Sequence, residues 1–369
     1  MVTRVDTLVV GAGVMGSAAA WQLARRGREV ALLEQFAPGH AQGASHGATR
    51  NFNTAYADPT YADLVLEAGT LWRELESETA TTLLDLVGLV NHGVNPAFDD
   101  VHHALTSRGA RACFLSAREA SERWPGMRFS TQVLYAPDAG RLRADVALQA
   151  LQTSARRHGA DIRHKTPVIN IRVVDDNLVR VLTDDETFEA RQVVVTVGAW
   201  TEKLLRSVTP LPRLVVTQEQ PAHFRPLDAP MSWPSFNHYP SPDHSADKYW
   251  YSPTYGMITP GEGVKAGWHG VGPVTDPDSR SFLAEPRQMA ALQRYAREWL
   301  PGVDADDFEP ISCTYTSTAN QAFVLDRTGP LVIGAGFSGH GFKFAPAIGR
   351  VLADLVDAQP TPDLFRIAR

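Results

Sequence analysis

The sequence is short of cysteine and has no long apolar run. Its 369 residues hold two cysteines, Cys113 and Cys313, which cannot form a disulfide framework. No apolar stretch approaches the roughly 20 residues of a membrane helix, and the first residues do not resemble a secretion leader. A net charge of −6 offers no basic surface for nucleic acid. We therefore expect a cytoplasmic protein that binds neither membranes nor nucleic acid.

Metal-binding patterns are missing as well. The 12 histidines do not stand at metal-ligand spacings with cysteine or carboxylates, so we expect no bound metal. The hydrophobic share of 44% and the charged share of 21% are those of an ordinary globular protein. The length predicts two or three domains, with ample apolar material for a core.

The sequence does have glycine, concentrated in two motifs. The first Gly-x-Gly-x-x-Gly motif follows an expected strand and opens an expected helix. In it, Gly11 permits a tight turn, Gly13 lets the backbone approach a pyrophosphate, and Gly16 lets the helix pack on the sheet. Glu34 ends the next expected strand, where a carboxylate can bind ribose hydroxyls and disfavours a 2′-phosphate. This pattern predicts a Rossmann site for NAD or FAD and does not separate the two.

The second glycine motif lies near the end of the chain, from Gly334 to Gly339. It also follows an expected strand and precedes an expected helix. No second parallel strand with a terminal acid is evident after it, so we do not expect it to complete a dinucleotide site. A helix N-terminus stabilises negative charge, such as that on the N1–C2=O edge of a reduced flavin. We expect the motif, with Lys343, to face that edge.

Pieces of nucleotide-binding type stand at the start, middle and end of the chain. Between them we expect a small β-meander over 168–190, a separate buried strand from 192 to 198, and a mostly β segment over 212–270. This order predicts interleaved domains. The FAD-binding domain would comprise residues 1–82, 138–211 and 317–369, and the substrate domain would comprise 83–137 and 212–316.

Taken alone, each cysteine is expected to be a small core hydrophobe. Five stretches change that view, because together they resemble the monomeric sarcosine oxidase family of amine oxidases, which includes N-methyltryptophan oxidase. They are VVGAGVMGSAAAWQLARRG, GASHGATR, VVVTVGAWTEKLL, VKAGWHG, and Cys313 followed by GPLVIGAGFSGHGFKFAPAIG. The resemblance covers nearly the whole chain.

The resemblance implies a fold and an activity. The fold is α/β with two domains: a glutathione-reductase-type FAD-binding Rossmann domain and an interleaved antiparallel β-sheet substrate domain. The activity is FAD-dependent oxidation of a secondary amine, such as an N-methyl amino acid, to an imine, with O2 reduced to H2O2. The protein would be a monomer whose partners are a small amine and O2.

The resemblance also implies residue roles. FAD would be covalently bound through Cys313, Lys265 would activate O2, and His269 would line the amine pocket. His46 and Arg50 would lie beside the flavin ring and take part in catalysis. The full set of expected cofactor contacts is Gly11, Gly13, Gly16, Glu34, Ser45, His46, Arg50, Val168, Gly198, Cys313, Gly336, Gly339, Gly341 and Lys343.

The match fails at the substrate. The family has a carboxylate-binding arginine three places after the Arg50 position, where this chain has Asn53, which cannot form a bidentate charged clamp. Lys343, the second carboxylate partner, remains. The family's active-site tyrosine corresponds only loosely to Trp250 or Tyr251. With His269, these are the expected substrate contacts. They predict a secondary amine other than sarcosine, either bulkier or without a free carboxylate.

Three alternatives remain open at this point. The first is a flavin oxidase of a cyclic imino acid or a sugar-modified amine, which a panel of amines would separate. The second is an NAD-dependent dehydrogenase, which rests on the first glycine motif alone and would lack the yellow colour of a flavoprotein. The third is a flavin-binding protein without catalysis, whose flavin no amine would reduce.

Overall fold

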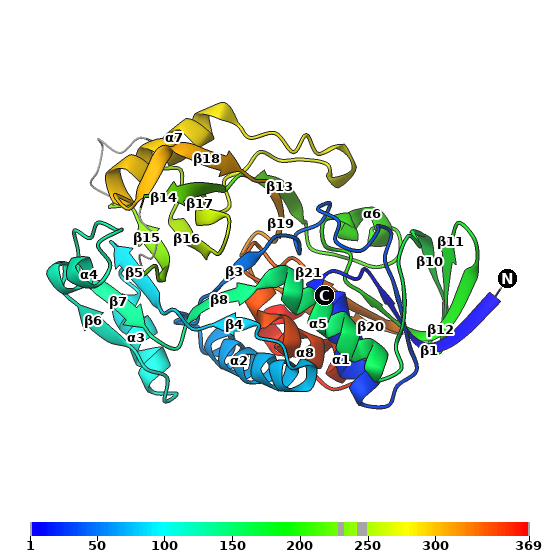
Figure 1. Ribbon diagram of the computed structural model, residues 1–369. Coiled ribbons are helices and arrows are strands. Elements are labelled where there is room, and N and C mark those ends of the chain that lie inside the picture. Colours follow the sequence, from blue (N-terminus) through cyan, green and yellow to red (C-terminus); the bar gives the residue numbers. More distant parts are fainter. Residues whose placement is uncertain (1, 228–231, 242–248, 368–369) are drawn as a thin grey trace.

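The computed structural model describes residues 2–227, 232–241 and 249–367, and Figure 1 shows their arrangement. One large sheet has the order β9-β2-β1-β12 in its parallel part, with β21 also parallel to β12. The apolar run Leu8–Val10 of β1 is buried, as expected of a central parallel strand covered on both faces. The strands are β1 (Val2–Val10), β2 (Val30–Leu33), β9 (Asp161–Arg163), β12 (Thr187–Val195) and β21 (Leu331–Ala335).

The expected meander is present, but its third strand was divided wrongly. Strands β10 (Val168–Asp175) and β11 (Leu178–Thr183) pair antiparallel, and β11 pairs with the first half of β12. Strand β1 pairs along the whole length of β12, and β21 pairs with the second half of β12. Meander and buried strand are thus one continuous element, because no glycine, proline or turn residue interrupts the sequence TFEARQVVV.

Helices cover one face of this sheet. They are α1 (Val14–Arg25), α2 (Pro59–Thr79), α5 (Ala144–Arg157) and α8 (Ala345–Val356). Helix α1 packs on α8 and α5, and a side chain at Gly349 of α8 would collide with Ala18 of α1. The close approach of these helices buries an apolar core that includes Trp21 and Trp72.

A second large sheet carries the other half of the molecule, with the order β18-β14-β17-β16-β15-β5-β7-β6. Helix α7 (Pro286–Trp299) packs on it at the top of Figure 1. Within the described residues its pairs are antiparallel except β15 with β5, which join two separate chain segments. The strands are β5 (Leu89–Gly93), β6 (Cys113–Leu115), β7 (Val133–Ala136), β14 (Ala222–Pro226), β15 (Ser235–Tyr239), β16 (Thr254–Thr259), β17 (Gly263–Trp268) and β18 (Val303–Pro310).

Short elements connect the two halves. Strand β13 (Val215–Glu219) pairs with β19 (Cys313–Ser317), and Figure 1 shows both between the two large sheets. The remaining elements are β3 (Thr49–Phe52), β4 (Leu84–Asp85), β8 (Gly140–Arg143), β20 (Val324–Thr328), α3 (Phe98–Thr106), α4 (Ala117–Arg123) and α6 (Thr201–Leu205). The strands of the first large sheet lie within 2–195 and 324–335, interrupted by those of the second at 89–136. We propose on this basis the domain boundaries expected from the sequence.

Two expectations of the sequence can be compared with the fold directly. Cys113 is exposed on β6, at the edge of its sheet, so the prediction that it is a core residue is wrong. The apolar character of its neighbours Phe114 and Leu115 does not bury it, because β6 has a partner on one side only. Among the described helices, none has both the length and the apolar character needed to cross a membrane.

Candidate active site

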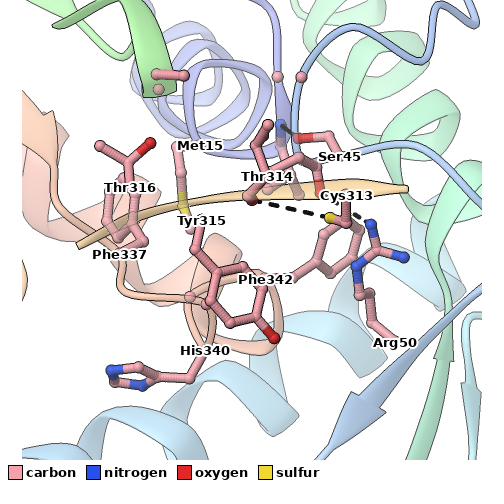
Figure 2. Close-up of a pocket in the computed structure, with 18 of the residues that line it drawn as sticks. Met15, Ser45, Arg50, Cys313, Thr314, Tyr315, Thr316, Phe337, His340 and Phe342 are labelled. Carbon is pink, nitrogen blue, oxygen red and sulfur yellow. Dashed lines mark hydrogen bonds between the residues drawn. The ribbon is translucent and has the colours of Figure 1, made fainter. Parts of the chain in front are cut away.

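A cavity of about 1120 Å³ lies between the two halves. Both halves contribute to its wall: the turn after β1, the irregular segment between β2 and β3, and the second glycine motif on one side, and β16 and β17 on the other. Strand β19, which lies between the halves, brings Cys313 to the same wall. Figure 2 shows Cys313, Arg50 and Tyr315 around this space.

The first glycine motif forms one end of the cavity. Gly11 has a left-handed backbone with φ of +92°, and a side chain at Gly16 would collide with the Gly11 carbonyl oxygen. The helix α1 therefore packs tightly behind the turn, as the motif predicts. Gly11 and Gly13 line the cavity, whereas Gly16 lies behind them and does not.

A buried carboxylate stands beside this turn. The Glu34 side chain is 7% exposed and accepts hydrogen bonds from the backbone N–H of Ala12 (2.9 Å) and of Phe36 (3.0 Å). Ser45 closes the same end, because its hydroxyl oxygen accepts a bond from the N–H of Val14 (3.0 Å). A carboxylate at the end of β2 and a helix N-terminus beside it suit a ribose and a pyrophosphate.

Cys313 lies at the middle of the cavity wall. It is the first residue of β19, is half-buried, and pairs across the ladder with Glu219. Its sulfur has the Thr314 carbonyl oxygen 3.8 Å away. The interpretation of Cys313 as a core hydrophobe is therefore wrong. Its side chain lines the cavity.

The second glycine motif packs against the strand of Cys313. Gly339 has φ of +77°, and a side chain there would collide with the ring of Tyr315. The N–H of Ser338 donates to the Thr316 carbonyl (3.0 Å), which ties the glycine loop to β19. Close packing against Tyr315 therefore explains why glycine is needed at position 339. Gly336, Gly339, Gly341 and Lys343 also line the cavity, together with Val168 and Gly198.

Two basic side chains stand near Cys313, the buried Lys265 and the half-buried Arg50. Lys265, on β17, is 5% exposed, and its Nζ lies 3.4 Å from the Thr49 carbonyl oxygen. Burial, helped by the charge of Arg50, lowers the pKa of Lys265 to about 7. Arg50 donates to the carbonyl oxygens of Ala44 (2.8 Å) and His46 (2.6 Å). Within the described residues neither has a carboxylate within 4.0 Å, so the cavity centre is electropositive.

A third cation, Lys343, lies at the other end. Its Nζ donates to the His340 carbonyl (2.8 Å) and lies 5.3 Å from the centre of the Tyr56 ring. Burial lowers the pKa of Lys343 to about 7. Among the residues that the structure describes, no carboxylate lies within 4.0 Å of it. Because a buried charge is costly without a partner, this lysine is suited to an anionic ligand.

The histidines of the cavity are neutral at pH 7. Burial lowers the pKa of His46 to about 3, with a further contribution from Arg50. Burial likewise lowers the pKa of His269 to about 4 and that of His340 to about 3. His269 Nδ1 lies 3.4 Å from the hydroxyl of Tyr315. His46 Nε2 is buried without a partner in the described protein.

The predicted substrate residues divide into two groups. Asn53, His269 and Lys343 line the cavity, but Trp250 and Tyr251 do not, so that prediction is wrong. Trp250 packs among Trp268, Tyr295 and Trp299 behind the second sheet, and Tyr251 is 44% exposed.

The aromatic residues that do line the cavity include Tyr56, Tyr255, Tyr315 and His340. Sequence reasoning missed all four. A signal existed for Tyr315, because it stands two residues after Cys313 and side chains alternate along a strand. Tyr255 lies on β16, whose residues reach the cavity only because β16 pairs with β17. No local pattern marks that pairing.

Comparison with known proteins identifies the family. A model of the family described as FAD dependent oxidoreductase matches residues 6–355. The chain belongs to this family. It is 32% identical to a monomeric sarcosine oxidase of Bacillus sp. (strain NS-129), over 98% of this chain and 95% of that protein. It is 29% identical to an N-methyl-L-tryptophan oxidase of Yersinia pestis (strain Pestoides F), over 99% of both chains.

A solved structure agrees with this assignment to the FAD dependent oxidoreductases. NikD, described as an unusual amino acid oxidase essential for nikkomycin biosynthesis, matches with a TM-score of 0.85 and 28% identity, over 98% of this chain and 96% of NikD. The resemblance and the fold class expected from the sequence are therefore confirmed. FAD is the cofactor, and the NAD-dependent alternative is no longer supported.

The cavity residues fit FAD. The glycine turn and Glu34 provide a ribose and pyrophosphate site at one end. His46 Nε2, buried without a protein partner, provides a polar atom farther along the wall. The cations around Cys313 suit a ring that becomes negative on reduction. The cavity residues would thus hold the nucleotide beside α1 and the flavin ring beside β19.

Proposed function

We propose that this protein is an FAD-dependent oxidase that converts a secondary amine to an imine and O2 to H2O2. One observation carries the proposal: Cys313, Lys265, Lys343 and the second glycine motif, from distant parts of the chain, line one cavity with the first glycine motif. The relatives named as oxidases of N-methyl amino acids support the same conclusion. Bound FAD would supply the two-electron chemistry that links amine to O2.

The surrounding residues favour the reactive form of the amine. Arg50 is a cation, Lys265 and Lys343 are cations below their pKa of about 7, and the nearby imidazole of His269 is neutral. Positive charge and burial both oppose a protonated amine, so the cavity selects the neutral amine, whose lone pair is free. His269, paired with the Tyr315 hydroxyl, offers a neutral polar contact to that amine. We assign His269 and Tyr315 to amine binding.

The attachment of FAD belongs to the same proposal. We propose that the Cys313 sulfur forms a thioether with the flavin 8α carbon. Lys265 is assigned to O2 activation, because a nearby cation stabilises the negative charge that O2 acquires on reduction. We also propose that the enzyme is a monomer, which light scattering of the purified protein tests.

The residues Lys343 and Asn53 indicate which class of amine the cavity accepts. Lys343 is a single buried cation suited to one anionic group. Asn53 accepts a hydrogen bond from the N–H of Ala55 (2.7 Å) through Oδ1, and its NH2 group has no partner in the described residues. A neutral donor and one lysine hold a small carboxylate more weakly than an arginine clamp. We propose a secondary amine bulkier than sarcosine, with cyclic imino acids and sugar-modified amines as the second candidate class.

The test is peroxide formation with a panel of amines. N-Methyl amino acids with large side chains should give saturable H2O2 production, and sarcosine should be a poor substrate. Anaerobic addition of the best amine should bleach the flavin. If no amine bleaches it, the protein binds flavin without catalysis and the proposal fails.

Asn53→Arg should improve sarcosine as a substrate. A charged bidentate contact contributes about 1.5–3 kcal/mol, so we expect kcat/KM for sarcosine to rise about 10- to 100-fold. Steady-state peroxide assays measure the change. Asn53→Gln, which adds length without charge, should leave it unchanged. An equal gain in both variants would show that charge at this position is not what limits sarcosine.

Carboxylate binding should weaken as pH rises above about 7. Lys343 has a pKa of about 7, so its charge is present below that value and is lost above it. The dissociation constant of a monocarboxylic acid without an amine should therefore rise up to about tenfold per pH unit above pH 7. Flavin absorbance reports the binding, and Lys343→Met should remove the dependence. The same slope in both proteins would contradict the role of Lys343.

A further inference from the structure

The segment from Gly39 to Gly47 forms part of the cavity wall without being a helix or a strand. It follows β2 and leads to β3, and it carries Ser45 and His46. A segment without regular hydrogen bonds must have its backbone carbonyl groups satisfied by other partners. The identity of those partners therefore decides the shape of this wall.

Two arginines bind the carbonyl groups of this segment. Arg50 donates to the carbonyl oxygens of Ala44 and His46. Arg280 approaches from the other half of the molecule and donates to the carbonyl oxygens of Gln42 (2.7 Å) and Ala41 (3.4 Å). Arg280 itself does not line the cavity. It binds the wall segment on the side that faces away from the cavity.

The same guanidinium also reaches the strand of Cys313. The second amino group of Arg280 donates to the hydroxyl oxygen of Ser312 (2.9 Å), the residue before Cys313. Arg280 is 7% exposed, and the described residues place no carboxylate within 4.0 Å of it. Burial lowers the pKa of Arg280, and the nearby thiol of Cys313 opposes part of that effect. One side chain thus joins the cavity wall to the residue next to Cys313.

A strap, defined here as residues 270–285, presents Arg280 in this position. Glu219 of β13 accepts the backbone N–H groups of Val271 and Gly272 (3.2 Å each) near the start of the strap. Gln218 donates to the carbonyl of Leu283 (3.0 Å) near its end. Figure 1 shows the strap reaching from the second sheet towards α6, and Lys203 of α6 pairs there with Asp276 and Asp278.

We propose that Arg280 is a positioning residue for FAD, which shapes the wall segment 39–47 and sets its distance to Cys313. Planar guanidinium donors suit this task, because a single group makes several directed charge-assisted bonds. The segment and the residue before β19 come from different parts of the chain, and Arg280 joins them on the side of the wall away from the cavity. The part of this role that concerns the Cys313–flavin bond rests on the proposed function.

The test separates the two sets of hydrogen bonds of Arg280, which are those to the wall segment and the one to Ser312. Elastase cleaves after small residues, and the wall segment contains Ala41 and Ala44. Elastase digestion of the holoenzyme, with the fragments identified by mass spectrometry, therefore reports on this segment. The fraction of flavin that stays in an acid precipitate reports on the bond to Cys313. Arg280→Met should increase cleavage between residues 37 and 45 about tenfold or more and lower the acid-stable fraction, because three charge-assisted bonds are lost. Arg287→Met, which removes an exposed arginine at the start of α7, is the matched control and should change neither.

Ser312→Ala removes only the hydrogen bond from Arg280 to the Ser312 hydroxyl. It should lower the acid-stable fraction while leaving the wall segment as protected as in the unaltered enzyme. If Arg280→Met does not fold, Arg280→Lys, which keeps the charge and loses the planar fork, should still expose the segment. Unchanged protection in the arginine variants overturns the proposal. An unaltered enzyme without acid-stable flavin refutes the thioether instead, and the protection measurement then judges Arg280 alone.

Discussion

Cys313→Ala should release all of its flavin on acid precipitation and should turn over about tenfold or more slowly. The sulfur is half-buried at the cavity wall, so its removal leaves the apolar core intact. A thioether raises the reduction potential of the flavin, and for a two-electron couple each loss of about 30 mV lowers the equilibrium constant for flavin reduction about tenfold. Acid precipitation followed by the absorbance of pellet and supernatant measures attachment, and peroxide assays measure turnover.

Cys113→Ala is the matched control for that change. Cys113 is exposed on an edge strand and does not line the cavity. It should keep the acid-stable flavin and the full turnover. Flavin that remains in the acid pellet of Cys313→Ala would place the covalent bond elsewhere and remove Cys313 from the proposal.

Lys265→Met should slow oxidation of the reduced enzyme by O2 about 100- to 1000-fold, the usual cost of removing one charge-stabilising group. Reduction by the amine should change by less than about tenfold, because Lys265 is placed near Cys313 and not at the substrate end. Stopped-flow mixing with amine without oxygen, and then with O2, separates the two steps. The pKa of Lys265, lowered to about 7 by burial, leaves it charged below that pH.

Lys343→Met should affect the reaction with the amine rather than the reaction with O2, the reverse of Lys265→Met. Both lysines are 5% exposed and both have a pKa near 7, so they are closely matched in environment. Lys343→Met should weaken amine binding and leave the reaction with O2 nearly unchanged. If Lys265→Met slows both steps equally, or if the two variants behave alike, Lys265 has no special part in the oxygen reaction.

The local elements could be predicted from the sequence where a pattern is complete within a few residues. The turn at Gly11 and the acid at Glu34 belong to one strand–helix–strand unit, and each residue of that unit has a defined task. The structure places them as expected. Cys313 shows the opposite case, because a single cysteine on an apolar strand has no local mark of function, and only the combination of distant stretches pointed to the cavity.

The error in the predicted aromatic residues has one cause. Trp250 and Tyr251 were predicted for the substrate site because the family's active-site tyrosine corresponds loosely to this stretch, but neither residue lines the cavity. Tyr255, four residues later, takes a place in the wall because β16 pairs with β17 in a particular register. The distance along the chain from a known motif does not show which face of a sheet a residue occupies when an irregular loop lies between them, because the register of the strand decides the face.

The sequence by itself predicted a dinucleotide site, because a glycine turn and a strand-terminal acid are short-range features, and the combination of five separate stretches pointed to the family and so to FAD. Only the tertiary structure decided which side chains share the cavity. Arg280 is the clearest example, since its partners Ala41, Gln42 and Ser312 lie 239, 238 and 32 residues away. Contacts at such separations depend on how two sheets and a strap pack together, and no local propensity encodes that packing.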